Sequence, residues 1–277
     1  MVNKNAVAEV KDVAGVPAYL AGYKGPATNT MMENEDRIVP RMKLLQAISP
    51  ELKAFNEAKE GVFWHSILNE SLGSEVRFSV IMARKSYVLF APRGDDRMIL
   101  ARSADGKTWD RPNESFEVKI KGYAKPVVWN TKGNVAESGL ANFGSSIPGD
   151  PQSPPAATLV YEYLVYLPDY PDCSPALISL SRSGIKRGKD LNSKISLRAG
   201  SVPQFAQMYK AVVTNEQSAE GGYNGWSFKS DGVADEATFN SVLALAKSFE
   251  STSFRASDED MSDEASTAAP ADSGGAY

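Results

Sequence analysis

Apolar and polar positions alternate most clearly in the second half of the chain. Residues 158–168 and 175–182 are rich in β-branched and aromatic side chains, and this composition predicts two strands. Residues 185–198 set apolar side chains among basic and polar ones and predict a short helix, although Gly188 weakens it by about 1 kcal/mol. Residues 204–230 predict a hairpin of two strands that turns at a pair of glycines.

Three further segments carry a readable pattern. Residues 76–90 alternate imperfectly and predict a strand, with Arg84-Lys85 in its middle marking a turn or an exposed bulge. Residues 38–55 carry apolar side chains at helical spacing, but Pro50 interrupts them, which favours two short helical turns. Residues 234–250 predict an amphipathic helix with acids in its first turn.

This order of elements predicts the fold class. Three strands, a helix and two strands follow one another as in a five-stranded OB-type barrel. We therefore expect a mainly β (α+β) protein with an OB-like antiparallel barrel in residues 37–250 and a large insertion at 92–157. A flexible arm (1–36) precedes this domain, and a disordered acidic tail (251–277) follows its C-terminal helix. The alternative is a generic antiparallel α+β sheet with one flanking helix.

The charge distribution is asymmetric. Lys and Arg number 30 and Asp and Glu number 34, but residues 256–277 hold six of the acids and no Lys or Arg. The rest of the chain therefore has a net charge of +2, and the tail imitates a polyanion that competes for a basic groove or recruits basic partners. The acids predicted to bind partners are Asp258, Glu259, Asp260, Asp263 and Glu264.

The sequence lacks the residues that several kinds of functional site require. One cysteine (Cys173) excludes an internal disulfide, and with one histidine (His65) it cannot supply a zinc site of Cys/His type. His65 lies among apolar residues, which favours a packed role over a catalytic one, and residues 184–190 lack the spacing of a phosphate-binding loop. No apolar run is long enough to span a membrane. We expect a soluble protein of a reducing compartment that is not an enzyme and holds no metal or cofactor.

The basic segment at residues 182–198 is the main candidate site. It contains six cations opposed by Asp190 alone, a density suited to a surface that follows a phosphate backbone and releases its counterions. A solvated helix face is the alternative. The predicted phosphate contacts are Arg182, Lys186, Arg187, Lys189, Lys194 and Lys210.

Aromatic side chains near basic residues supply the second half of this prediction. Proteins that bind single strands stack unpaired bases on aromatic rings, at about 1–3 kcal/mol per base. Alternation along 223–230 places Trp226 and Phe228 on one face, which is a stacking platform if exposed and ordinary core if it points inward. The predicted stacking residues are Trp129, Tyr223, Trp226 and Phe228.

Four segments resemble those of a tailed-phage protein family: 40–52, 86–94, 179–195 and 221–228. The layout of that family is similar to that of phage single-stranded-DNA-binding proteins, with an OB-like body, a C-terminal helix and an acidic tail. The resemblance implies a protein that coats and protects single-stranded DNA during phage replication and recombination in the host cytoplasm. It also implies that the tail recruits phage replication or recombination proteins.

Two other functions stay open beside sequence-nonspecific binding of single-stranded DNA. A phage structural or scaffolding-type interaction protein would use the strands as an interface and pack the aromatic rings. A recombinase that anneals single strands would bind the same ligand but assemble into rings. A homodimer is compatible with all of these functions, and no membrane partner is expected.

Overall fold

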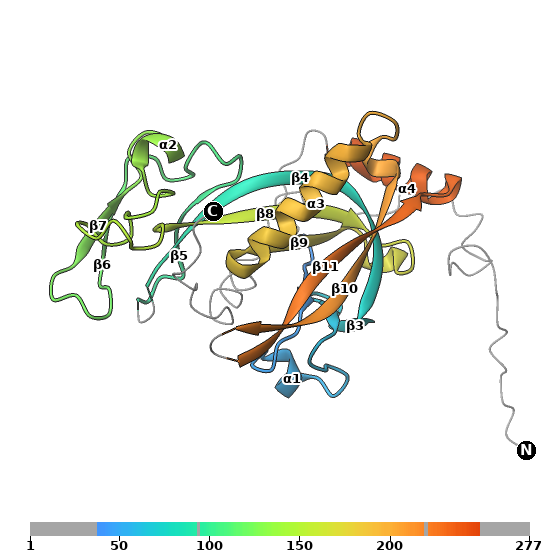
Figure 1. Cartoon of the computed structure of the whole chain (residues 1–277), viewed down its shortest axis with the longest axis horizontal. Helices are drawn as coiled ribbons and strands as arrows, with labels where there is room; N and C mark the ends of the chain where they lie inside the picture. Colours follow the sequence, from blue (N-terminus) through green and yellow to red (C-terminus); the bar gives the residue numbers. More distant parts are fainter. Residues whose placement is uncertain (1–37, 93–94, 219–220, 250–277) are drawn as a thin grey trace, which may run out of the picture. The chain divides into compact units, whose positions relative to one another are not determined.

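A six-stranded antiparallel sheet organises the chain (Figure 1). The structure is a computed structural model that describes residues 38–92, 95–218 and 221–249, so the predicted N-terminal arm and acidic tail lie outside the described residues. The five strands on the main path follow the order β11-β10-β4-β8-β9, and β5 pairs with β4 beyond this path. Their bounds are β4 (Glu75–Phe90), β5 (Ile99–Ser103), β8 (Ala157–Tyr166), β9 (Ala176–Ser181), β10 (Gln207–Ser218) and β11 (Gly221–Val233).

The mainly β, antiparallel fold class predicted from the sequence is confirmed, and the order of three strands, a helix and two strands occurs at the predicted segments. No hydrogen-bonded ladder joins β9 to β11 within the described ranges, so closure into an OB-like barrel stays a prediction. Residues 40–46 link these two edges instead. The Leu177 amide of β9 donates to the Pro40 carbonyl (2.7 Å), and the Gln46 side chain bonds the backbone of Asn224 in β11.

Strand β4 is continuous through Arg84-Lys85, so the expected turn or exposed bulge does not occur there. The Arg84 guanidinium lies opposite Glu162 of β8 and donates to its carboxylate at 2.8 Å. The irregularity falls earlier, between Val80 and Met82, where the register with β8 shifts. Pairing with a buried carboxylate on the neighbouring strand keeps a cation inside the sheet without a break in the ladder.

The segment predicted as two helical turns holds one strand and one helix. β1 (Met42–Leu44) pairs with β2 (Phe63–His65), which pairs with β3 (Glu70–Gly73), and α1 spans Glu51–Ala54. The β1 strand forms because Met42 is buried in the main core cluster together with Phe63 and Leu72. Tertiary packing therefore overrides the helical spacing in this segment.

The connection from β4 to β8 has its own apolar core. It contains β5, the hairpin of β6 (Ser115–Val118) and β7 (Val127–Asn130), and α2 (Val135–Ser138). Phe116 and Val118 of β6 pack with Val127 and Trp129 of β7 in a cluster that reaches Leu89 of β4. The predicted insertion is therefore a folded extension of the sheet rather than a structureless loop.

Two helices complete the described part. α3 (Ile185–Arg198) has the bounds predicted from the sequence and contacts β8, β9 and β11 (Figure 1). α4 (Glu236–Phe249) buries Val242 against Val160 and Leu164, a separate apolar cluster from the one that α3 joins. Among the described residues, neither helix nor any other has the length and apolar character needed to cross a bilayer.

Gly188 in α3 is required by packing. The helix approaches β8 so closely that a Cβ at position 188 would lie 2.6 Å from the Tyr161 ring, and the Tyr163 hydroxyl donates to the Gly188 carbonyl at 2.9 Å. The sequence pattern treats this glycine as a weakness of the helix, whereas the structure uses it for contact with the sheet.

Gly188→Ala is expected to destabilise the protein although alanine favours helix. The new methyl group must displace the Tyr161 ring, and overpacking of this kind costs about 1–3 kcal/mol. Urea denaturation would measure the loss. Gly200→Ala is the matched control, because nothing lies within 4 Å of a Cβ there. A Gly188→Ala variant as stable as the control would contradict the close approach.

Candidate nucleic-acid interface

Two of the predicted phosphate contacts stand exposed on α3. Lys186 and Lys189 lie on the outward face of the helix, and neither forms an ion pair with a residue in the described ranges. Gly188 and Leu191, on the opposite face, are buried against the sheet and fix the direction in which the two lysines point. Arg182 precedes the helix in a left-handed backbone conformation, with φ of 45°.

The other three predicted cations are paired with acids. The Arg187 guanidinium contacts Glu216 of β10 at 2.7 Å, Lys194 pairs with Asp190 one turn earlier in α3, and the Lys210 ammonium lies 3.4 Å from Glu75. Each of these pairs must open, or accept a phosphate beside the acid, before the cation can contact DNA. The sequence could not show the acids of β4 and β10 as partners because they are distant along the chain.

The Glu216 side chain connects α3 to the β10–β11 hairpin through hydrogen bonds. Its carboxylate accepts from Arg187 and also from the Tyr223 hydroxyl at 2.8 Å. Burial alone would raise the pKa of Glu216, but the hydrogen bonds from Arg187 and Tyr223 outweigh it and hold this pKa below its ordinary value. At neutral pH the carboxylate is therefore charged and holds the Arg187 side chain.

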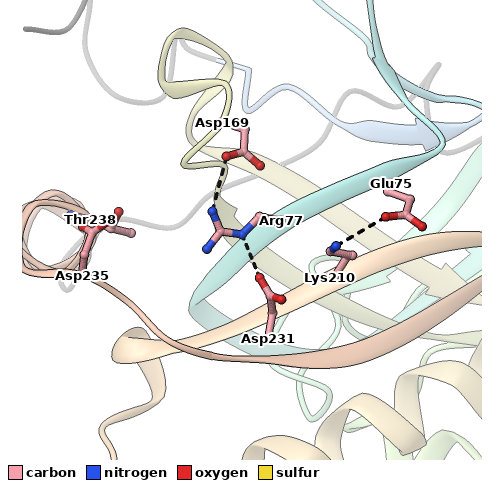
Figure 2. Close-up of polar contacts among 7 residues, drawn as sticks. All are labelled: Glu75, Arg77, Asp169, Lys210, Asp231, Asp235 and Thr238. Carbon is pink, nitrogen blue, oxygen red and sulfur yellow. Dashed lines mark hydrogen bonds and ion pairs between the residues drawn. The ribbon is translucent and has the colours of Figure 1, made fainter.

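Lys210 lies apart from the α3 cations. Tyr209 and Ala211, its neighbours in β10, join the core cluster that includes Leu191 of α3, so Lys210 points to the other face of the sheet. Figure 2 shows Lys210 beside Glu75, and next to them Arg77 between Asp169 and Asp231. This face alternates cations with acids, which does not favour a phosphate backbone.

The aromatic predictions need a correction for two residues. Trp129 is 5% exposed in the core of the insertion, and Phe228 is 3% exposed in the main core, where its ring meets Phe78 edge-on. Neither ring has a free face, so the structure contradicts their role in base stacking. The physical reason is that both strands turn their apolar side inward, and the sequence pattern specifies only which residues share a side.

Trp226 and Tyr223 are half-buried. The Trp226 ring is stacked on Phe228 and lies 4.7 Å from the Phe63 ring, measured between centroids. The Tyr223 ring is held by the bond from its hydroxyl to Glu216, and burial together with this carboxylate raises the pKa of Tyr223. Of the two alternatives left open by the sequence for the Trp226 face, the structure therefore favours core packing over an open stacking platform.

The insertion carries a basic loop that was not predicted as a site from the sequence. The turn between β6 and β7 contains Lys119, Lys121 and Lys125, all exposed, with the Tyr123 side chain 47% exposed among them. None of the three lysines forms an ion pair with another residue that the structure describes. The signal was present in the sequence as three lysines around a tyrosine with no acid between residues 118 and 136.

The described residues contain no group of three or more His, Cys, Asp and Glu side chains placed to hold a metal ion. His65 and Cys173 are both buried, and burial lowers the pKa of His65 and raises that of Cys173.

Comparison with known families places the chain among phage proteins. A family model described as Pam3 phage gp34-like protein matches residues 8–255. The chain belongs to this family. No curated protein and no solved structure gives a significant match. The phage resemblance drawn from the sequence is thus confirmed at the level of a gp34-like phage family, and the description of that family names no ligand.

The acidic residues predicted to bind partners lie outside the described residues of this gp34-like protein. Asp258, Glu259, Asp260, Asp263 and Glu264 also follow the end of the family match at residue 255. Their charge is known from the sequence alone.

Proposed function

We propose that this gp34-like phage protein binds single-stranded DNA without sequence preference, coats it during phage replication and recombination, and acts by binding rather than catalysis. The observation that carries the proposal is the exposed pair Lys186 and Lys189 on α3, which form no ion pair with any residue that the structure describes. Such lysines follow a phosphate backbone by charge alone, which makes the binding nonspecific and sensitive to salt.

Two features support the same proposal. α3 connects β9 to β10, the third and fourth strands in chain order on the main path of the sheet, and this order of elements occurs in OB folds, which bind oligonucleotides. The described surface also offers cations in excess on α3 and on the β6–β7 loop, whereas residues 256–277 hold six acids and no Lys or Arg. A net positive body with a separate anionic segment suits a polyanionic ligand.

The test is fluorescence anisotropy of labelled oligo-dT rather than tryptophan quenching, because Trp64, Trp109 and Trp129 are buried. An oligonucleotide of about 30 nucleotides exceeds the ~4–16-nucleotide site of one OB fold. We expect binding at low salt, weaker binding to duplex DNA, and a linear fall of log affinity with log salt concentration. A parallel titration with oligo-U compares DNA with RNA.

Lys186→Ala with Lys189→Ala should weaken this binding. Each lost phosphate contact lowers the slope of log affinity against log salt concentration by about 0.7. The loss of two contacts should therefore weaken the affinity about 25-fold at 0.1 M salt. Lys53→Ala with Lys59→Ala removes the same charge from exposed positions near α1 and is the matched control. Equal effects of the two double variants would contradict a site on α3.

A protein-interaction role in the phage particle is the second candidate. Its candidate contacts are two apolar side chains that stand in solvent, Phe143 at 77% and Leu197 at 85% exposure. If the unaltered protein fails to bind oligo-dT at low salt, this second function replaces the first.

A further inference from the structure

The loop between β6 and β7, residues 119–125, has the composition of a surface that grips a single strand. It reads Lys-Ile-Lys-Gly-Tyr-Ala-Lys, so cations alternate with other side chains around Tyr123. The lysines at 119, 121 and 125 are exposed and form no ion pair within the described ranges. Three of the predicted cations, in contrast, are neutralised by acids.

The loop contains a hydrogen-bonded turn. The Tyr123 amide donates to the Ile120 carbonyl at 3.0 Å, and Gly122 between them has φ of +92°, a conformation that glycine adopts without strain. Ile120 turns inward and packs against the core of the insertion. The turn therefore presents Tyr123 outward, with 47% of its side chain exposed.

The hairpin beneath the loop is anchored in the sheet. Phe116, Val118 and Trp129 are buried with Leu89 of β4, and the Trp129 indole N–H donates to the Ser146 carbonyl at 3.1 Å. Trp129, which cannot stack on a base, instead supports the strand that leads out of the basic loop. A basic loop on such a support loses less conformational entropy when it binds a ligand than an unsupported loop would.

We propose that this loop is a second contact for single-stranded DNA, in which the Tyr123 ring stacks on one unpaired base and Lys119, Lys121 and Lys125 contact phosphates. This inference rests on the proposed function. The ligand is single-stranded because an exposed ring gains its stacking energy from the face of a base that is not covered by its neighbours in a duplex. The surrounding cations match the backbone on either side of that base.

The experiment compares variants in anisotropy titrations with oligo-dT and with an abasic strand of the same length. Tyr123→Ala should weaken oligo-dT binding about tenfold, the lower range for one stacked base, and Tyr123→Trp should restore it. On the abasic strand Tyr123→Ala should bind like the unaltered protein, because no base is left to stack.

The lysines are tested by the triple variant Lys119→Ala, Lys121→Ala and Lys125→Ala. It should weaken binding to both strands and lower the salt slope by about 2, since each phosphate contact contributes about 0.7. The matched control is Lys53→Ala, Lys59→Ala and Lys247→Ala, which removes three exposed lysines from α1, its neighbourhood and α4. All exchanged side chains are exposed, and equal urea midpoints would verify the fold of each variant.

Failure of this inference is distinct from failure of the proposed function. If the unaltered protein binds oligo-dT but the Tyr123 and triple-lysine variants bind equally well, the loop is not a contact and the function stands. If Tyr123→Ala weakens binding to the abasic strand as much as to oligo-dT, the stacking role is wrong. If the unaltered protein binds neither strand, both proposals fall.

Discussion

Replacing Phe228 by alanine is expected to lower the free energy of unfolding by about 3–5 kcal/mol while the folded variant keeps its affinity for oligo-dT. The ring is 3% exposed and lies between Phe78 and Trp226, so its loss leaves a cavity in the main core. Urea denaturation measures the stability, and anisotropy measured well below the transition gives the affinity.

The milder change Phe228→Leu keeps an apolar side chain and should cost about 1–2 kcal/mol. Its affinity for oligo-dT should equal that of the unaltered protein. The reverse pattern, normal stability with weakened binding, would show that Phe228 meets bases and that the sequence-based prediction was right.

Removing residues 256–277 is expected to tighten binding to oligo-dT about tenfold at low salt. A segment tethered to the same chain acts at an effective concentration of the order of 1 mM, and nonspecific electrostatic sites bind polyanions at about 0.1 mM or tighter. The segment carries six acids and no cation, so we expect it to compete with DNA for the same lysines. Anisotropy with oligo-dT measures the change.

A full-length control separates charge from length. Exchange of Asp258, Glu259, Asp260, Asp263 and Glu264 for their amides should reproduce the effect of the deletion. The difference should vanish near 1 M salt, where the Debye length is about 3 Å. Unchanged or weaker binding after the deletion would show that the tail does not compete with DNA for the binding site.

The sequence predicted the parts of the fold that carry a long local pattern. α3 has its predicted bounds because Leu191 and Ile195 recur at helical spacing, and the final hairpin follows from a pair of glycines between two apolar runs. β1 was missed because its three residues are too few to show a period. It is a strand because Phe63–His65, distant along the chain, supplies its ladder.

The candidate site was predicted less well than the fold, for two physical reasons. Alternation placed Trp226 and Phe228 on one face, but only their contact with Phe63 and Phe78 decides that this face is the core. Similarly, a count of cations includes Arg187, yet Glu216 from another strand holds its side chain. Lys186 and Lys189 were predicted as contacts, and both are exposed. Their direction could be predicted because the position of a residue along a helix determines the face on which its side chain lies.

The contacts of α3 also have a mechanical consequence. Near its start Arg187 reaches Glu216, close to the tip of the β10–β11 hairpin, and at its end Arg198 donates to the Gly232 carbonyl at 3.0 Å, at the base of the same hairpin. The helix thus contacts both ends of the hairpin formed by β10 and β11, and these contacts limit how far the two strands can bend. A force applied at the hairpin tip would pass through α3 into β8, because the Tyr163 hydroxyl of β8 donates to the Gly188 carbonyl in the first turn of the helix.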